Sequence, residues 1–143
     1  MRTRLIGWTA TLAVVAATAG CGLTGEQPKE PSQRSGRVVL GDKSRPTQSV
    51  KCTQTDWALN IYANTNPGSA QVALTIGGEK PTVDTVSIEN IDGVSGVSGG
   101  AVGKAEARLD NNSSYTITGT ARVTDSADPS QTTDMPFTIE APC

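Results

Sequence analysis

The sequence contains no histidine, and this absence limits the chemistry available to the protein. Histidine is the side chain that titrates near neutral pH and the commonest metal ligand in proteins. The chain also lacks a G-x-S-x-G nucleophile motif, a P-loop and a dinucleotide-binding glycine fingerprint. We therefore expect no catalytic residues, no metal site and no cofactor, and we predict that the protein is not an enzyme.

Clusters of lysine and arginine are missing as well. Without its first 20 residues, which we argue below are removed, the chain keeps 10 basic and 14 acidic residues, a net charge of −4. Proteins that bind nucleic acid carry a basic surface, and polybasic segments are what anionic lipid headgroups attract. We exclude nucleic acid as a partner and expect no attraction to anionic headgroups.

Long hydrophobic runs are absent, apart from one near the N-terminus. Arg2 and Arg4 precede an apolar run over residues 5–19, which is shorter than the roughly 20 residues that a membrane-spanning helix needs. This pattern predicts a signal peptide over residues 1–20. An uncleaved membrane anchor is the alternative.

The apolar run ends in Thr18-Ala19-Gly20-Cys21, which resembles a bacterial lipobox. In a lipobox, small residues precede a cysteine whose sulfur is acylated, although Thr18 stands where Leu is usual. We predict cleavage between Gly20 and Cys21 and lipid on Cys21. Two or more acyl chains hold a protein stably at a membrane, so we expect an anchor on the extracytoplasmic side of the cell membrane. A plain secretory cut near residues 17–19 is the alternative, and it would leave a soluble protein.

Cysteine is scarce, and the number of cysteines supports the lipobox. The chain has three, and an odd cysteine in an exported protein needs an explanation. If Cys21 carries lipid, Cys52 and Cys143 remain as one pair in an oxidising compartment, where disulfides persist. We predict a disulfide between them; two free thiols are the alternative.

Residues 21–36 contain almost no apolar side chains and two prolines. Such a composition buries too little surface to offset the entropy lost on ordering, so it predicts a flexible tether. Thr24, Ser32 and Ser35 could accept sugars, but three hydroxyls are ordinary in a linker. We expect them to be unmodified.

Residues 37–143 are enough for one small domain. Apolar and polar residues alternate with period two, which is typical of half-buried strands, in residues 57–63, 70–76, 101–109, 115–123 and 137–141. Trp57 shares its predicted inward face with Leu59 and Ile61. Three further runs, residues 38–40, 49–53 and 83–91, complete the set. The pattern predicts an all-β fold, either a small antiparallel β-sandwich or a strongly curved sheet, of seven to eight short strands.

Two irregularities interrupt this pattern. Val83 is out of phase with Val86 and Ile88, which predicts a β-bulge near Asp84 and Thr85. Residues 94–103 are rich in glycine. A phosphate cradle would need a helix to follow, so we interpret them as a flexible or bulged connection along an exposed edge.

Carboxylates are the remaining candidates for chemistry. Asp92, Asp110, Asp125 and Asp128 all lie in predicted turns, where we expect them to accept hydrogen bonds from nearby backbone amides. Two alternatives stay open. A weak calcium site could form at Asp125 and Asp128, and a carboxylate-dependent hydrolase would need two acids facing each other across a cleft.

Several segments together resemble the mycobacterial 19-kilodalton lipoprotein antigen family. The resemblance spans the predicted domain and lies in residues 38–43, 49–53, 86–94, 115–121 and 137–140 with Cys143; the Y-x-I-T-G-T-A run from Tyr115 is its most specific part. It implies a surface-exposed envelope lipoprotein, with a disulfide from Cys52 to Cys143. It also implies host partners: an innate receptor for the lipidated Cys21 end, and the host-cell surface. The tether here is charged and not rich in Thr and Ser, so the family's glycosylation there does not carry over.

The leading hypothesis is a membrane-anchored, surface-exposed lipoprotein that acts as an antigen or adhesin-type interaction module. A carrier for a small apolar ligand is the second hypothesis, and it requires an apolar cavity. The hydrolase is the third.

Overall fold

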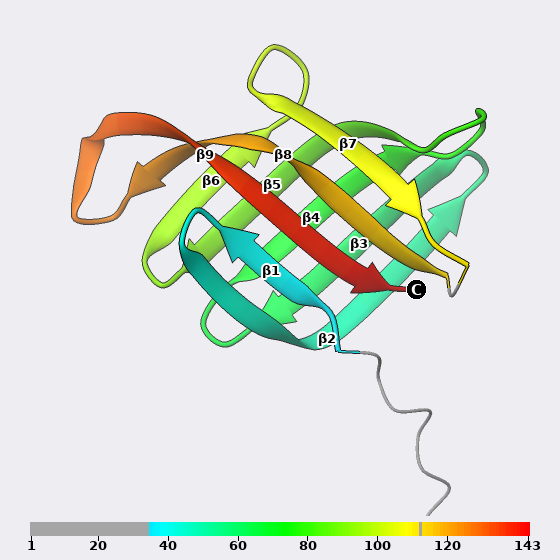
Figure 1. Ribbon diagram of the computed structural model, residues 1–143, viewed down its shortest axis with the longest axis horizontal. Coiled ribbons are helices and arrows are strands. Elements are labelled where there is room, and N and C mark those ends of the chain that lie inside the picture. Colours follow the sequence, from blue (N-terminus) through cyan, green and yellow to red (C-terminus); the bar gives the residue numbers. More distant parts are fainter. Residues whose placement is uncertain (1–34, 112) are drawn as a thin grey trace, which may run out of the picture. The chain divides into compact units, whose positions relative to one another are not determined.

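The computed structural model describes residues 35–111 and 113–143 (Figure 1). The predicted signal peptide, its cleavage site at Gly20 and Cys21, and the tether up to residue 34 lie outside the described residues. Within residues 35–111 and 113–143, no helix is long and apolar enough to cross a membrane.

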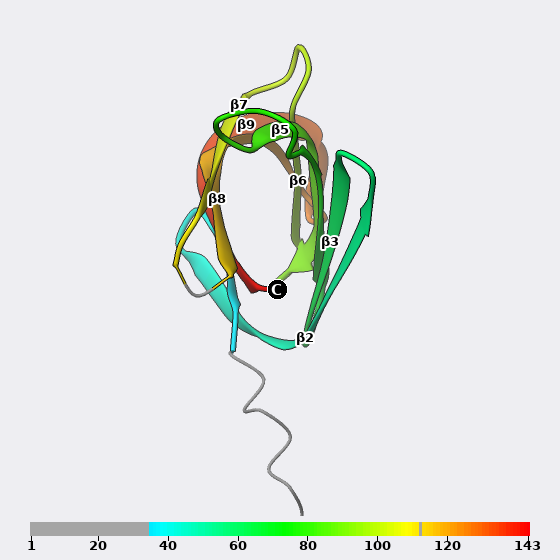
Figure 2. The same cartoon turned by 90° about the vertical axis from the view of Figure 1, so that its right-hand side faces the viewer.

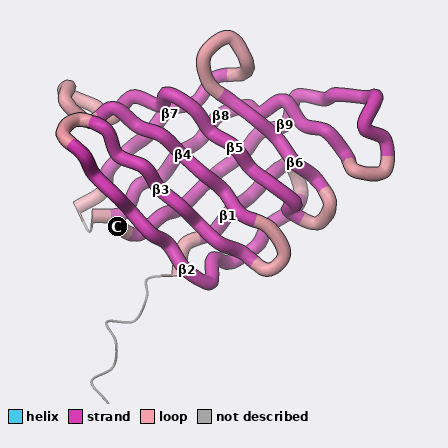
Figure 3. Tube along the Cα trace, turned by 180° about the vertical axis from the view of Figure 1, so that it is seen from behind, coloured by secondary structure: helices cyan, strands magenta, loops and turns pink. Residues whose placement is uncertain are grey.

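Nearly all of the described chain is strand, joined by loops and turns (Figure 3). The strands are β1 (Arg37–Leu40), β2 (Lys43–Thr55), β3 (Ala58–Thr65), β4 (Ser69–Thr75), β5 (Thr82–Ile91), β6 (Val94–Ser98), β7 (Lys104–Leu109), β8 (Ser114–Asp125) and β9 (Asp128–Pro142). The strands β8, β2 and β9 reach 12 to 15 residues and are longer than the short strands that we predicted.

The sheet closes on itself. Its strands pair antiparallel in the order β6-β5-β4-β3-β2-β1-β9-β8-β7, and β6 also pairs with β8. Eight strands therefore form a closed barrel, seen as a ring in Figure 2. The all-β, antiparallel prediction is confirmed and the β-sandwich is wrong. Closure leaves few strand edges without a hydrogen-bonded neighbour. Two packed sheets would have more such edges, and these would need protection from pairing with other chains.

The barrel is closed by β6, which belongs to the glycine-rich segment 94–103 that we expected to be a flexible or bulged connection. Val94 to Val97 pair with the end of β8, while β6 also pairs with β5. Gly96 is buried, and a Cβ there would lie 3.1 Å from Val123 Cγ2. The glycine that weakens the local strand signal is thus the residue that allows β6 to approach β8 closely.

One edge of β8 is shared by two strands. Arg122 to Asp125 pair with β6, and Tyr115 to Thr120 pair with β7. The loop of residues 99–103 separates β6 from β7. Among the described strands β7 forms a ladder with β8 alone, so the start of β5 and β7 face each other across a seam without backbone pairing.

Inward-facing apolar side chains fill the barrel, as expected for a ring of eight strands. The predicted alternation is confirmed in β3, β4, β8 and β9. Within the described part of the chain, the core is formed by 20 residues that include Leu40, Leu59, Ile61, Val72, Leu74, Ile88, Ile117, Phe137 and Ile139. The predicted bulge is also confirmed. Ala73 pairs with Thr85 and Leu74 pairs with Val83, which leaves Asp84 as the extra residue.

Trp57 and Leu109, two large side chains on predicted inward faces, lie outside this core. Trp57 precedes β3 in a turn and is 68% exposed, and Leu109 ends β7 and is 51% exposed. The period-two pattern does not show that a side chain stands at or beyond the limit of a strand, because periodicity alone does not locate a turn.

Candidate functional site

The cysteine pair lies at one end of the barrel. Cys52 of β2 and the C-terminal Cys143 form a disulfide, with their Cα atoms 5.8 Å apart. The Cys143 N–H also donates a hydrogen bond of 2.9 Å to the Ser113 carbonyl in the turn after β7. The disulfide therefore fastens the last residue of the chain to β2, and the backbone contact fastens it to the β7–β8 turn.

The turn carboxylates are used locally. Asp110 accepts from the Ser114 N–H at 2.9 Å and Asp125 accepts from the Ala127 N–H at 2.9 Å. Asp128 accepts from the Ser130 hydroxyl at 2.7 Å. Within residues 35–111 and 113–143 no group of three or more acidic or cysteine side chains is placed to hold a metal ion. Asp110 and Asp125 therefore accept from backbone amides, as we expected from the sequence, whereas Asp128 accepts from a side-chain hydroxyl.

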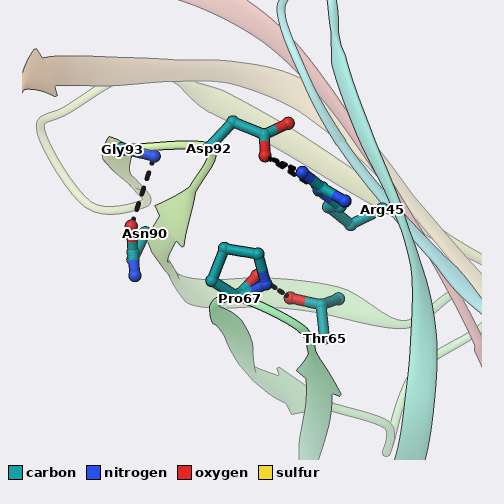
Figure 4. Close-up of polar contacts among 6 residues, drawn as sticks. All are labelled: Arg45, Thr65, Pro67, Asn90, Asp92 and Gly93. Carbon is teal, nitrogen blue, oxygen red and sulfur yellow. Dashed lines mark hydrogen bonds and ion pairs between the residues drawn. The ribbon is translucent and has the colours of Figure 1, made fainter.

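Asp92 forms an ion pair with Arg45 of β2 (Figure 4). Asp92 adopts a positive φ of 53° in the β5–β6 turn, and Arg45 Nε donates to its carboxylate at 2.9 Å. This hydrogen bond raises the pKa of Arg45. Asn90 in the same turn accepts from the Gly93 N–H at 3.2 Å. These polar contacts therefore link β2 to the β5–β6 turn and stabilise that turn, at the end of the barrel where β5 ends.

A groove of about 820 Å³ opens at the other end of β5, along the seam with β7. One wall is the β4–β5 loop with the start of β5, and the other wall is β7. Its apolar lining consists of Ile76, Pro81, Val83, Ala105, Ala107, Leu109 and Tyr115. This volume falls within the roughly 300–1,000 Å³ of ligand sites, and the unpaired seam is what leaves room for it.

Charged side chains also line the groove. Glu79 and Lys80 come from the β4–β5 loop, and Glu106 and Arg108 come from β7. All four are exposed. The groove thus combines an apolar wall with two charges of each sign.

A second hollow of about 260 Å³ adjoins the groove and shares Leu109 and Tyr115 with it. The disulfide residues Cys52 and Cys143 line this hollow. Leu109 is half-exposed between the two spaces, so an apolar surface runs from the seam to the disulfide.

Trp57 lies beside the groove. Its carbonyl accepts from the Ile76 N–H at 2.8 Å. A Cβ on Gly77 would lie 3.1 Å from Trp57 Cδ2, so the indole packs directly over this glycine. An exposed tryptophan held against a groove-lining loop was not predicted from the sequence, where Trp57 counted as core.

Sequence reasoning missed the groove for a physical reason. Its walls are residues 76–83 and 105–109, which are separated in the chain and meet only because β6 closes the barrel. The period-two pattern predicted the strands that contribute to these walls, but it does not show that they lie next to each other in space. The exposed Leu109 could have been suspected, since it immediately precedes a turn.

The sequence profile described as Mycobacterium 19 kDa lipoprotein antigen matches residues 29–143. The chain belongs to this family. The resemblance inferred from the sequence is confirmed, and the protein is a mycobacterial lipoprotein. The match includes the described domain, both disulfide cysteines and both walls of the groove.

Two relatives come from Mycobacterium avium. Lipoprotein LpqH is 35% identical over 107 residues, which cover 74% of this chain and 66% of that protein. A protein named as a lipoprotein in Mycobacterium avium subsp. hominissuis (strain TH135) is 28% identical over 136 residues, 94% of each chain. Both names agree with the family.

Proposed function

We propose that this family member is a non-catalytic lipoprotein, anchored by lipid on Cys21, that displays its β-barrel on the extracytoplasmic side of the cell membrane as an interaction module. The match to a lipoprotein antigen family over residues 29–143 carries the proposal. Cys21 supports it, because it follows an apolar run and small residues and stands outside the disulfide.

The absence of catalysis is part of this proposal. The turn carboxylates that were candidates for chemistry accept hydrogen bonds from their own turns. Glu79 and Glu106 share the groove with Lys80 and Arg108, which compensate their charge, and both acids are exposed. The general acid of a glycosidase lies in an apolar environment, whereas these two side chains are exposed to solvent.

Two host partners are proposed, one for the acylated Cys21 end of the mature chain and one for the barrel. The acylated Cys21 end would be recognised by an innate receptor of the host, and the barrel would contact the host-cell surface. These roles are those that the family resemblance implies for an antigen or adhesin.

The anchor is tested by the intact mass of protein extracted from membranes. We expect a chain that starts at Cys21 and carries two or three acyl groups. The Cys21→Ala variant should lose the acyl mass and leave the membrane fraction, while its barrel melts at the wild-type temperature. An unmodified chain cut before Cys21 would refute the anchor.

The groove favours one second function, the binding of a small apolar ligand. Its size and its apolar lining support this role. Titration of the protein with a medium-chain fatty acid should shift the emission of Trp57 beside the groove. An emission spectrum that stays constant up to saturating fatty acid would rule this function out.

A further inference from the structure

The groove end of the barrel exposes the kind of side chains that enter a membrane surface. Trp57 and Leu109 are 68% and 51% exposed, and they flank a groove with apolar walls. Tryptophan is enriched at membrane interfaces, where its ring sits at the level of the headgroups. The opposite end of β5 carries the Arg45–Asp92 ion pair instead.

The charges of the groove also fit a particular class of lipid. Glu79 and Glu106 bring two negative charges, and Lys80 and Arg108 bring two positive charges. A zwitterionic phospholipid headgroup carries one phosphate and one ammonium group, so both of its charges find a counterpart here. An anionic headgroup would meet a protein with a net charge of −4 after signal removal and would be disfavoured.

The described chain begins close to this groove. Arg37 pairs with Glu140, Glu140 with Thr116, and Thr116 with Arg108 of the groove wall. Neighbouring strands lie about 4.8 Å apart, so three spacings place the start of β1 roughly 14 Å from that wall. The 14 residue steps from Cys21 to Ser35 can span at most about 50 Å. This length lets the groove reach the bilayer that would hold the anchor.

We propose that the end of the barrel formed by Trp57, Leu109 and the groove docks on the anchoring membrane, and that the groove receives an acyl chain of a zwitterionic phospholipid. The inference rests on the proposed lipid anchor at Cys21 and names the apolar ligand of the groove. The barrel would then lie against the membrane by one defined end.

Trp57 is a built-in probe of this contact. The chain has two tryptophans, and the other, Trp8, belongs to the predicted signal peptide. The lipidated mature protein, which begins at Cys21, is reconstituted into phosphatidylcholine vesicles whose acyl chains carry bromine, which quenches indole fluorescence at short range. We expect strong quenching relative to vesicles without bromine.

Two matched variants locate the contact. Leu109→Glu places a charge at the groove and should reduce the quenching several-fold. Val97→Glu makes the same type of change at a residue that is 49% exposed on β6 and lines a different hollow, so it should behave like wild type. Melting curves of the two variants verify that both barrels are folded.

Three results would overturn the inference. Absence of bromine quenching would mean that this end does not meet the acyl chains, and equal quenching in all three proteins would mean that the groove takes no part. An emission that shifts with protein concentration without vesicles would assign this end to a second copy of the chain. Sedimentation of the protein with the vesicles separates these results from loss of the anchor, since an anchored but unquenched protein contradicts only the docking.

Discussion

Single glycines decide how closely the strands of this barrel approach one another. Gly119 of β8 lies opposite Ala105 of β7. A Cβ at position 119 would lie 2.7 Å from the Ala105 Cα and would overlap the Lys104 carbonyl. Both obstacles are backbone atoms, which cannot rotate away as a flexible side chain could. The residue must therefore remain glycine for β7 to stay paired with β8.

We predict that Gly119→Ala lowers the free energy of unfolding by about 1–3 kcal/mol, the usual cost of overpacking. Urea unfolding followed by fluorescence measures the change. Gly78→Ala is the control, since a Cβ there meets its nearest atom, the Lys80 carbonyl, at an ordinary 3.6 Å. Equal stability of Gly119→Ala and wild type would show that β7 can shift without loss.

At the scale of the element, β6 decides the topology. It is five residues long, yet it is paired on both sides, with β5 and with β8. The 15-residue β9, by contrast, extends past β1 with residues that are mostly exposed. Strand β6, the second shortest, therefore contributes more to the closure of the barrel than its length suggests.

We predict that Val97→Pro opens the barrel at β6. Proline cannot donate to a ladder and is found in sheets at edges or bulges, whereas Val97 has a strand on either side. We expect a loss of about 3 kcal/mol or more in the free energy of unfolding, together with faster hydrogen exchange in β5 and β8. Val97→Thr retains the backbone N–H and should cost less than about 1 kcal/mol. Wild-type exchange in the proline variant would contradict the role of β6.

At the scale of the whole molecule, the disulfide compensates for a light core. Five of the 20 core residues are alanines, and alanine buries little apolar area. The bond between Cys52 and Cys143 closes a loop with a sequence separation of 91. Closing so long a loop removes much of the conformational freedom of the unfolded chain.

We predict that reduction lowers the melting temperature, because the loop-closure estimate assigns the bond roughly 4.5 kcal/mol at most. That is comparable with the stability of a small domain. Calorimetry with and without reductant measures the shift, and the Cys52→Ser, Cys143→Ser double variant should match the reduced protein. Identical melting temperatures would refute a stabilising role for the bond.

The sequence by itself determined the all-β class, the inward faces of most strands, the bulge at Asp84 and the disulfide. Each of these depends on local information: the side-chain period of a strand, one residue out of phase, or the parity of the cysteines. The family could also be inferred, since short motifs such as the run from Tyr115 survive as sequence. The anchor at Cys21 remains a prediction.

Only the tertiary structure decided that the sheet closes, and with it the site. Period two indicates which face of a strand is buried but not which strands are neighbours, so a sandwich and a barrel have the same signature. The pairing of β6 with β8 joins residues that are 25 to 31 positions apart in the sequence. This pairing brings the β4–β5 loop opposite β7 and so creates the groove. Trp57 and Leu109, which the alternation places on inward faces, lie at the groove because Trp57 stands in the turn before β3 and Leu109 is the last residue of β7.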